Sequence, residues 1–199
     1  GLDAIFFAIY LGQGPVTDEG HAAAHEKTLA TFRRIHEIVN NNPETVELAL
    51  TPADARRIES AGKRAIFIGI ENGYPVGTEL ANVSRFYKEG ARYITLCHNG
   101  NNAICDSSTA KEPEHDGLSP FGEQVVREMN RLGMLIDISH TADSTVEDIL
   151  AISTAPVFAS HSGARAVCDH PRNLPDELIR AVSKKGGVIQ VCMVPSFVT

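Results

Sequence analysis

The stretch LGMLIDISH, residues 132–140, contains the join that decides the fold. Leu132 ends an amphipathic helical pattern, and Gly133 is the residue type that most readily takes the left-handed conformation that closes a helix. The apolar run 134–139 then predicts a buried strand, and His140 follows it directly. The same helix–glycine–strand join recurs at Gly62 before 65–70, at Gly90 before 92–97 and at Gly186 before 188–193.

Strands therefore alternate with helices along most of the chain. Apolar runs at 2–10 and 156–160 raise the number of predicted strands to six. Residues 18–40 form one amphipathic helical pattern, while Thr51 and Ser119 are capping residues that each precede a proline at the first helical position. No Asn-Gly pair joins two strands as a hairpin, so we expect parallel strands covered by helices on both faces. Two architectures fit: an open doubly wound sheet, and a (β/α)8 barrel from which two strands are missing.

The composition is that of an ordinary globular domain. Of the 199 residues, 43% are hydrophobic and 22% are charged, and the formal net charge is −7. This acidic balance argues against a nucleic acid or an anionic membrane as a partner, and no apolar run is long enough for a transmembrane helix. None of the four cysteines forms a CxxC pair, which leaves the redox compartment open. The first residue is Gly1 and not methionine, so we expect the chain to have been trimmed.

Polar residues follow four consecutive predicted strands, at Glu71, His98, His140 and His161. In a parallel βα barrel the carboxyl ends of the strands meet at one face, where active sites lie. Three neutral imidazoles and a carboxylate suit zinc or another divalent transition metal, and a carboxylate can bridge two ions. A single histidine at a strand end is more often structural, but four such residues together favour a metal site.

Other polar residues carry weaker signals. His21 and His25 are spaced i, i+4 and share a helix face, but their charged neighbours predict a solvated face and not a chelating pair. Asp137 lies at odd spacing from His140, so we expect it to face the other side of the strand in a structural role. Arg172 falls in a charged loop after the fifth predicted strand. It is either a surface arginine or an anchor for a substrate carboxylate.

Longer motifs carry a resemblance to a known family. They are GLSPFGEQVVREMNRLGMLIDISH at 117–140, APVFASHSGARAVCDHPRNLPDELIRAV at 155–182, TLCHNGNNAICDSS at 95–108, IGIENG at 68–73 and GLDAIFFAIYLGQG at 1–14. Together they resemble the membrane (renal) dipeptidase family of zinc peptidases over nearly the whole chain. The resemblance implies a (β/α)8 barrel of the metal-dependent hydrolase kind. It also implies the hydrolysis of dipeptides, often with a D-residue tolerated at the C-terminal position.

The resemblance gives each matching position a role. Glu71 corresponds to the carboxylate that bridges two zinc ions, and His140 and His161 correspond to the histidines of the second zinc. His98 corresponds to the histidine that contacts the scissile carbonyl and its oxyanion. Arg172 corresponds to the arginine that receives the terminal carboxylate of the substrate. These roles imply a dipeptide substrate and two zinc ions in the complete enzyme.

Departures from the family pattern limit the match. No His-x-Asp pair occurs near the start of the chain, where the family takes ligands for the first zinc, and the aspartate that follows the family's last strand is missing. Asn72-Gly73-Tyr74 stands where many relatives have Gly-Gly-His, which affects substrate contacts more than the bridge. We therefore expect residues 1–199 to be the central part of a single (β/α)8 metallopeptidase domain, about strands two to seven, and to be inactive alone.

Two alternative functions remain open from the sequence. One is the hydrolysis of a cyclic amide or lactam on the same barrel, and the other is a non-catalytic metal-binding relative. The sequence flanking residues 1–199 in the parent protein would discriminate between an enzyme and a binding protein. A homodimer is one assembly open to the complete protein, and an exported location, periplasmic or cell-surface, is favoured over a cytoplasmic one.

Overall fold

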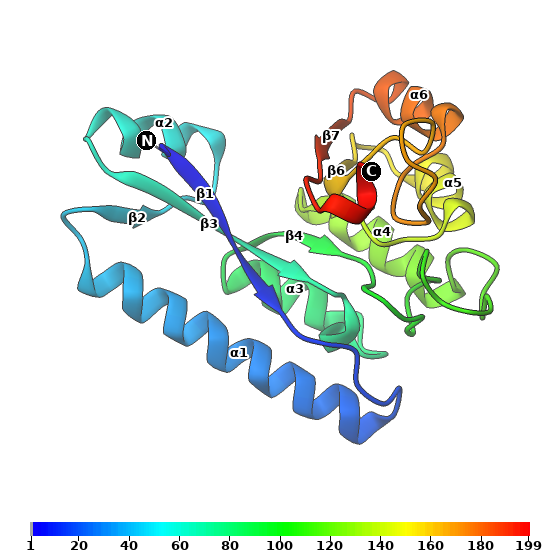
Figure 1. The fold of residues 1–199 in the computed structure, drawn as a ribbon. Helices are drawn as coiled ribbons and strands as arrows, with labels where there is room; N and C mark the ends of the chain where they lie inside the picture. The colour runs from blue at the N-terminus through cyan, green and yellow to red at the C-terminus, as the bar shows by residue number, and fades with distance from the viewer. Residues whose placement is uncertain (1) are drawn as a thin grey trace.

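The computed structural model describes residues 2–199, in which parallel strands alternate with helices (Figure 1). The strands are β1 (Ala4–Tyr10), β2 (Val46–Leu48), β3 (Arg64–Glu71), β4 (Ala91–Thr95), β5 (Leu135–Asp137), β6 (Phe158–Ser162) and β7 (Val188–Val191). The α-helices are α1 (Asp18–Asn41), α2 (Pro52–Ser60), α3 (Ala81–Lys88), α4 (Pro120–Leu132), α5 (Asp143–Ile152) and α6 (Asp176–Lys184). Two 3₁₀ turns are η1 (Tyr74–Val76) and η2 (Pro195–Phe197).

The strands pair in parallel in the order β1-β3-β4-β5-β6-β7, while the short β2 pairs with the start of β3. A doubly wound sheet reverses its strand order at a switch point, whereas a (β/α)8 barrel adds its strands in sequence. Here the sheet curls into a half-barrel, and the consecutive helices α3 to α6 pack side by side along it (Figure 1). The predicted incomplete barrel is confirmed, and the open doubly wound alternative is wrong.

The predicted helix ends are confirmed in detail. The hydroxyls of Thr51 and Ser119 each accept a hydrogen bond from a backbone amide in the first turn of α2 and α4. After α4, Gly133 has a φ of 73°, a left-handed conformation that strains residues with a side chain. These signals are reliable because a cap satisfies backbone groups that the helix itself leaves unpaired.

Strand lengths differ from the prediction at the end that carries the polar residues. β4 ends at Thr95 and β5 ends at Asp137, two residues before the predicted strand ends at 97 and 139. Cys97 and Ile138 lie past the strand ends but stay buried, so an apolar pattern cannot separate them from strand residues. The pattern also does not predict β2, because three residues with a charged Glu47 at the centre form no apolar run.

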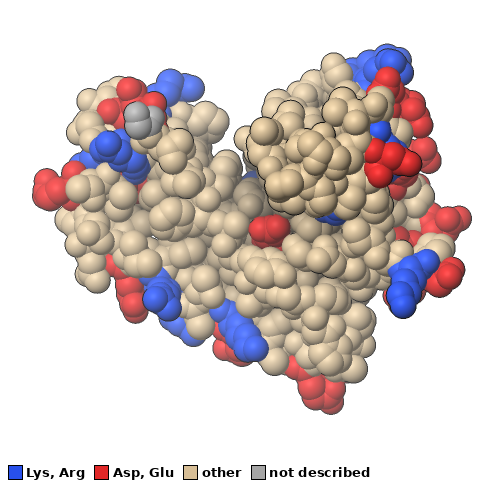
Figure 2. All heavy atoms as spheres, viewed as in Figure 1, with Lys and Arg blue, Asp and Glu red and all other residues tan. Residues whose placement is uncertain are grey.

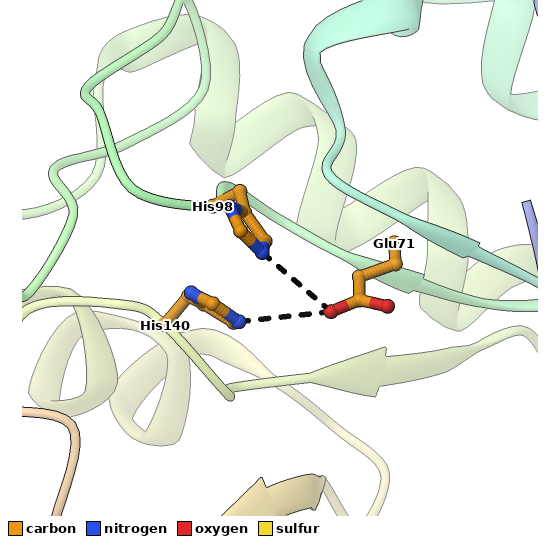
Figure 3. Close-up of side chains that lie close together, drawn as sticks. All are labelled: Glu71, His98 and His140. Carbon is orange, nitrogen blue, oxygen red and sulfur yellow. Dashed lines mark ion pairs between the residues drawn. The ribbon is translucent and has the colours of Figure 1, made fainter. Parts of the chain in front are cut away.

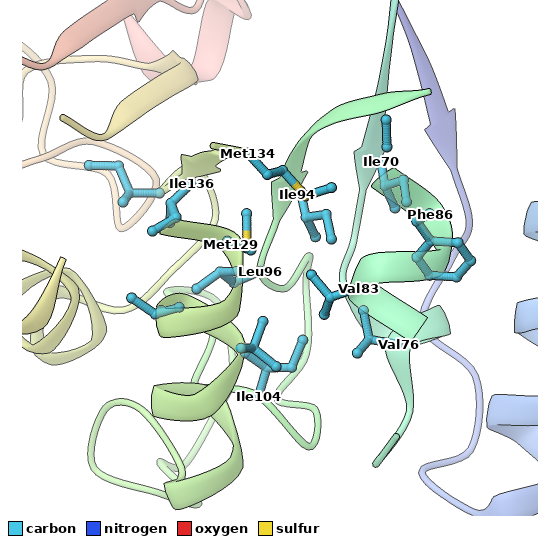
Figure 4. Close-up of a cluster of buried hydrophobic side chains, with 14 of the residues drawn as sticks. Ile70, Val76, Val83, Phe86, Ile94, Leu96, Ile104, Met129, Met134 and Ile136 are labelled. Atoms are coloured by element: carbon cyan, nitrogen blue, oxygen red, sulfur yellow. The ribbon is translucent and has the colours of Figure 1, made fainter. Parts of the chain in front are cut away.

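The main hydrophobic core lies between the sheet and the helices that cover it, and Figure 4 shows the part of it at α3 and α4. Ile70 of β3 is in register with Ile94 of β4, which is in register with Ile136 of β5. All three are buried in one cluster with Phe86 of α3 and Met129 of α4. This register aligns the carboxyl ends of β3, β4 and β5. The residues that follow these strand ends can therefore meet at one place.

The two edge strands expose apolar side chains. Ile5, Phe6 and Tyr10 on β1 are between 37% and 51% exposed, and Val188 and Val191 on β7 are 60% and 67% exposed. Figure 2 shows charged side chains mostly around the rim of the molecule in this view, with one red group and a little blue in the hollow at its centre. Apolar side chains on an unpaired strand edge are a template for association with another chain.

Residues 1–199 expressed alone are expected to associate or to be poorly soluble. Within residues 2–199, the path from β1 to β7 has two strands fewer than an eight-stranded barrel needs, so the outer backbone groups of both edge strands lack partners. Light scattering after size-exclusion chromatography, over a series of protein concentrations, is the measurement. A monodisperse monomer that unfolds cooperatively would contradict this expectation.

Candidate metal centre and active site

Glu71 and three histidines meet at the carboxyl ends of strands β3 to β6. Figure 3 shows His98 and His140 pointing at the same oxygen of Glu71, and both Nε2 atoms lie 3.7 Å from this Oε1. The Nε2 of His161 lies 3.4 Å from Oε1 of Glu71 and 2.9 Å from Nε2 of His140. The rings of His98 and His140 stack with 3.9 Å between their centroids. The fold thus brings together all four residues that the strand-end pattern selects.

The four residues differ in where they lie relative to the ends of their strands. Glu71 is the last residue of β3 and His161 lies within β6, whereas His98 and His140 stand three residues beyond the ends of β4 and β5. His140 has a φ of 71°, and Asn72, directly after Glu71, has a φ of 84°. Positive φ at a residue with a side chain persists only where the surrounding structure enforces it, and such positions cluster at functional sites.

The turn after Glu71 is held by Asn72, a residue type that tolerates this left-handed conformation. Its Nδ2 donates to the carbonyl of Leu11 (3.0 Å), and its Oδ1 accepts from the amide of Tyr74 (3.1 Å). The hydroxyl of Tyr74 in turn donates to the carbonyl of Pro15 (2.7 Å). Asn72 and Tyr74 lie in the segment where many members of the resembled family have Gly-Gly-His. In this chain they therefore anchor the loop that follows β1.

Burial keeps the three imidazoles neutral near pH 7. It lowers the pKa of His140 to about 4 and holds the pKa values of His98 and His161 below their ordinary range, although Glu71 acts in the opposite direction. The interaction with His140 lowers the pKa of Glu71, so its carboxylate is ionised. Neutral imidazoles and an ionised carboxylate are the protonation states that bind metal ions.

The metal-free complete protein is expected to lose stability as the pH falls from about 6.5 to about 4. Unfolded His140 takes up a proton near its ordinary pKa of 6.5, but buried His140 does so only near 4. Between these values the unfolded state binds more protons, so the free energy of unfolding falls with the pH, by about 3 kcal/mol for this group. Denaturant unfolding over this pH range is the measurement. His140→Asn, which suits the left-handed backbone, should flatten the slope, and an unchanged slope would contradict the assignment.

The cluster fits a divalent metal ion. Two ligands on a tetrahedral zinc are about 3.3 Å apart when each bond is about 2.0–2.1 Å. The three distances among Oε1 of Glu71, Nε2 of His140 and Nε2 of His161 are 2.9, 3.4 and 3.7 Å, which bracket this value. Glu71, His98 and His140 form a second possible group, whose ligand atoms lie within 4.8 Å of one another. Both groups share Glu71 and His140, so the third ligand is either His161 or His98.

A cavity of about 510 Å³ opens at this cluster, a size that suits a small molecule. Arg172 lines it but is only 4% exposed, so the interpretation of this residue as a surface arginine is wrong. Its Nη2 donates to the carbonyl of His161 (3.1 Å), and its guanidinium lies 5.6 Å from the ring centre of Phe197. Burial lowers the pKa of Arg172. The ring of Tyr10 lies 4.8 Å from that of His98.

The profile of the family described as Membrane dipeptidase (Peptidase family M19) matches residues 1–199. The chain belongs to the membrane dipeptidase family. Dipeptidase tcpJ of Claviceps purpurea (strain 20.1) is 35% identical over 196 residues, which cover 96% of this chain and 46% of that protein. Dipeptidase verJ of Clonostachys rogersoniana is 37% identical over 175 residues, which cover 86% of this chain and 45% of that protein. The chain spans about half the length of the curated relatives it matches.

Solved structures share the fold of this membrane dipeptidase chain. The probable dipeptidase PvdM from Pseudomonas aeruginosa superposes with a TM-score of 0.87 at 34% identity, over 91% of this chain and 47% of that one. A metallo peptidase from Rhodobacter sphaeroides, liganded with a phosphinate mimic of the dipeptide L-Ala-D-Ala, has a TM-score of 0.83 at 22% identity, over 96% of this chain and 62% of that one. The second likeness shows the fold alone. The resemblance stated from the motifs is confirmed.

Two features of the membrane dipeptidase chain escape the sequence patterns. His21 and His25 are each only 9% exposed, so the prediction of a solvated helix face is wrong. The rings of Tyr74 and Phe86 cover them, while the charged neighbours of the pair on α1 are exposed. Tyr10, beside His98, is also missed, although its place at the end of the first strand is a signal that could have found it.

Within residues 2–199, no helix is both long and apolar enough to cross a membrane.

Proposed function

We propose that the complete protein is a zinc-dependent dipeptidase. The observation that carries the proposal is a single cavity that joins one carboxylate, three neutral imidazoles and a buried arginine. The family of the chain and the dipeptidase names of its relatives support the reaction class. Tolerance of a D-residue at the C-terminal position is the finer part of the proposal, and it follows from the resemblance.

Glu71, His140 and His161 would hold zinc, with Glu71 as the bridge between two ions. The close approach of the two Nε2 atoms of His140 and His161 supports their pairing on one ion. When bound, zinc lowers the pKa of a water molecule and polarises a carbonyl. His98 is free for the substrate in this arrangement. Its neutral ring has one N–H group, which can donate to the oxygen on which negative charge develops.

Arg172 would receive the terminal carboxylate of the substrate. A guanidinium offers a planar pair of donors that matches a carboxylate, and this contact gains strength where water is excluded. Because the buried arginine lies in the same cavity as the histidine cluster, a substrate chain held by both must end close to the scissile bond. This geometry supports selection of dipeptides over longer peptides.

The test is hydrolysis by the complete protein, measured by chromatography of the products. We expect cleavage of L-Ala-L-Ala and of L-Ala-D-Ala, little cleavage of tri-alanine, loss of activity with a chelator and recovery with added zinc. A cyclic dipeptide in the same assay tests the cyclic-amide alternative, and its cleavage in place of the linear dipeptides would contradict the proposal. Zinc binding without hydrolysis of any of these would support a non-catalytic relative. A homodimer and an exported location stay predictions.

A further inference from the structure

Asp137, the last residue of β5, is a fully buried carboxylate close to the histidine cluster. Its oxygens accept hydrogen bonds from the hydroxyls of Thr95 (2.5 Å) and Ser160 (2.6 Å). They also accept from the backbone amides of Ser139 (3.0 Å) and Ser160 (2.9 Å). Four donors therefore surround the two oxygens of this carboxyl group. The arrangement ties the ends of β4, β5 and β6 to one side chain.

The hydroxyl of Ser160 links this carboxylate to His161. Its Oγ lies 2.6 Å from Oδ2 of Asp137 and 2.7 Å from Nδ1 of His161. The hydroxyl has one proton, which it donates to Oδ2 of Asp137. Ser160 must therefore accept a hydrogen bond from His161, so the ring proton of His161 is on Nδ1.

We propose that Ser160 and Asp137 are positioning residues that hold His161 in its Nδ1-protonated tautomer. The Nε2 atom then keeps its lone pair, and this is the atom that lies 3.4 Å from Glu71 and 2.9 Å from Nε2 of His140. A neutral imidazole binds a metal through its unprotonated nitrogen, and the hydrogen bond at the other nitrogen orients the ring. The proposal rests on the proposed metal site, and it says that His161 is set as a ligand before the metal arrives.

His140 differs from His161 in this respect. Its Nδ1 is buried and has no hydrogen-bond partner among residues 2–199. Its Nε2 faces a nitrogen that holds a lone pair, so the proton between the two rings belongs to His140 in the metal-free protein. Metal binding through this atom requires that proton to leave Nε2. One ligand is therefore prearranged by its hydrogen bonds, and the other changes its protonation when the metal binds.

Nitrogen-15 spectra of the histidines in the metal-free complete protein report the tautomer of each ring. We expect Nδ1-protonated His161 in the wild type and a mixture of tautomers in Ser160→Ala, with zinc affinity lower by about 10- to 100-fold. Ser160→Thr keeps the hydroxyl and should restore both properties. Ser162→Ala makes the same change two residues along β6, at a hydroxyl outside the network, and should leave both unchanged.

An Nε2-protonated His161 in the metal-free wild type would overturn the proposal, whether or not the variants fold. So would an unchanged tautomer and unchanged zinc affinity in Ser160→Ala. Because the spectra are recorded without metal, they judge the tautomer separately from the proposed function. A wild-type protein that binds no zinc would contradict the proposed function instead.

A second pair of histidines lines another cavity, of about 540 Å³, between α1 and the segment η1–α3. His21 and His25 stand one turn apart on α1 and are each 9% exposed. Their rings lie 5.2 Å from that of Tyr74 and 5.1 Å from that of Phe86, between centroids. Within residues 2–199, neither nitrogen of either ring has a hydrogen-bond partner.

Four buried nitrogens without partners call for a physical reason. A buried polar group that is left unsatisfied destabilises the folded state. Protonation does not remove this cost, because burial lowers the pKa of His21. A divalent transition metal does, since two histidines at i, i+4 spacing can place two lone pairs on one ion. The carboxylates of Asp18, Glu26 and Glu79 are exposed along the same cavity, so a rotation of one side chain can add a third ligand.

We infer that His21 and His25 form a further divalent-metal site, independent of the strand-end cluster. Zinc alone is the probe, in equilibrium dialysis of the complete protein. In Glu71→Gln, where the strand-end cluster is impaired, one zinc per chain should remain. Adding His25→Gln or His21→Gln should remove it, and zinc should then no longer raise the melting temperature. His36→Gln is the matched control, because His36 lies on the same helix but its Nε2 is bonded to the carbonyl of Glu89 (2.9 Å).

Equal zinc content with and without His25→Gln in that background would overturn the inference. So would the absence of zinc from the folded Glu71→Gln protein. If one histidine variant fails to fold, the other still decides, because each removes one of the two ligands. Neither result depends on hydrolysis, so the proposed dipeptidase function is judged separately.

Discussion

Glu71→Gln in the complete protein is expected to empty both strand-end zinc positions and to abolish hydrolysis. In the proposed site one carboxylate would serve both ions, and a neutral amide oxygen cannot replace its charge beside His98, His140 and His161. Removing one partner of a buried charged group costs about 3–5 kcal/mol, which corresponds to about 150- to 5000-fold in zinc affinity. Zinc titration in a His25→Gln background is the measurement, so that the helix pair does not contribute.

Two variants make this expectation specific. Glu123→Gln changes the same residue type on α4, where the carboxylate is exposed and pairs with Arg127 at 3.3 Å, and it should bind zinc as the wild type does. His140→Ala should empty mainly one of the two positions, since the proposed site assigns this ring to one ion. Retention of two zinc ions at wild-type affinity in Glu71→Gln would show that this carboxylate is not the bridge.

Arg172→Ala is expected to lower kcat/KM for dipeptides by about 30- to 1000-fold. This range corresponds to about 2–4 kcal/mol for the loss of a charge-assisted, bidentate contact with the terminal carboxylate. Arg172→Lys should recover only part of the loss, because an ammonium group does not reproduce the planar fork. A dipeptide amide lacks the carboxylate, so it should be a poor substrate for the wild type and little affected by the substitution.

The structure makes the comparison of the two substrates necessary. Arg172 also donates to the carbonyl of His161, so its removal can disturb a metal ligand as well as a substrate contact. If dipeptide and dipeptide amide fall by the same factor, Arg172 supports the metal site and does not bind the carboxylate. Arg165→Ala is the matched control, because Arg165 follows the same strand but forms its ion pair with Asp143 (2.6 Å).

Much of the fold follows from signals that act over a few residues. The caps at Thr51 and Ser119 and the left-handed glycine at Gly133 satisfy backbone groups close to them in the chain, so their effect can be predicted without the rest of the molecule. The meeting of Glu71 and His161 follows from the sequence as well. Parallel strands joined by helices send their carboxyl ends to one face, whatever the details of their contacts.

The positions of the other two histidine rings depend on backbone segments that lie beyond the ends of their strands. His98 and His140 stand beyond their strands, and the positive φ of His140 aims its ring at Glu71. Alternation along β5 does predict that Asp137 and His140 differ in direction, but β5 ends at Asp137 and the alternation does not extend to the histidine. A period of two residues holds only while the strand continues.

The sequence by itself determined the alternation of helices and strands apart from β2 and the face on which the polar strand ends gather, and its longer motifs, through the resemblance, pointed to the parallel half-barrel. Only the tertiary structure decided which polar side chains are buried and what they bond. His21 and His25 are enclosed by η1 and α3, about fifty residues further along, and Asp137 receives its donors from β4 and β6. A short sequence pattern indicates the backbone conformation that its residues prefer and which face of a helix or strand is apolar. Burial and hydrogen bonding depend on segments far away in the chain, which no short window of sequence contains.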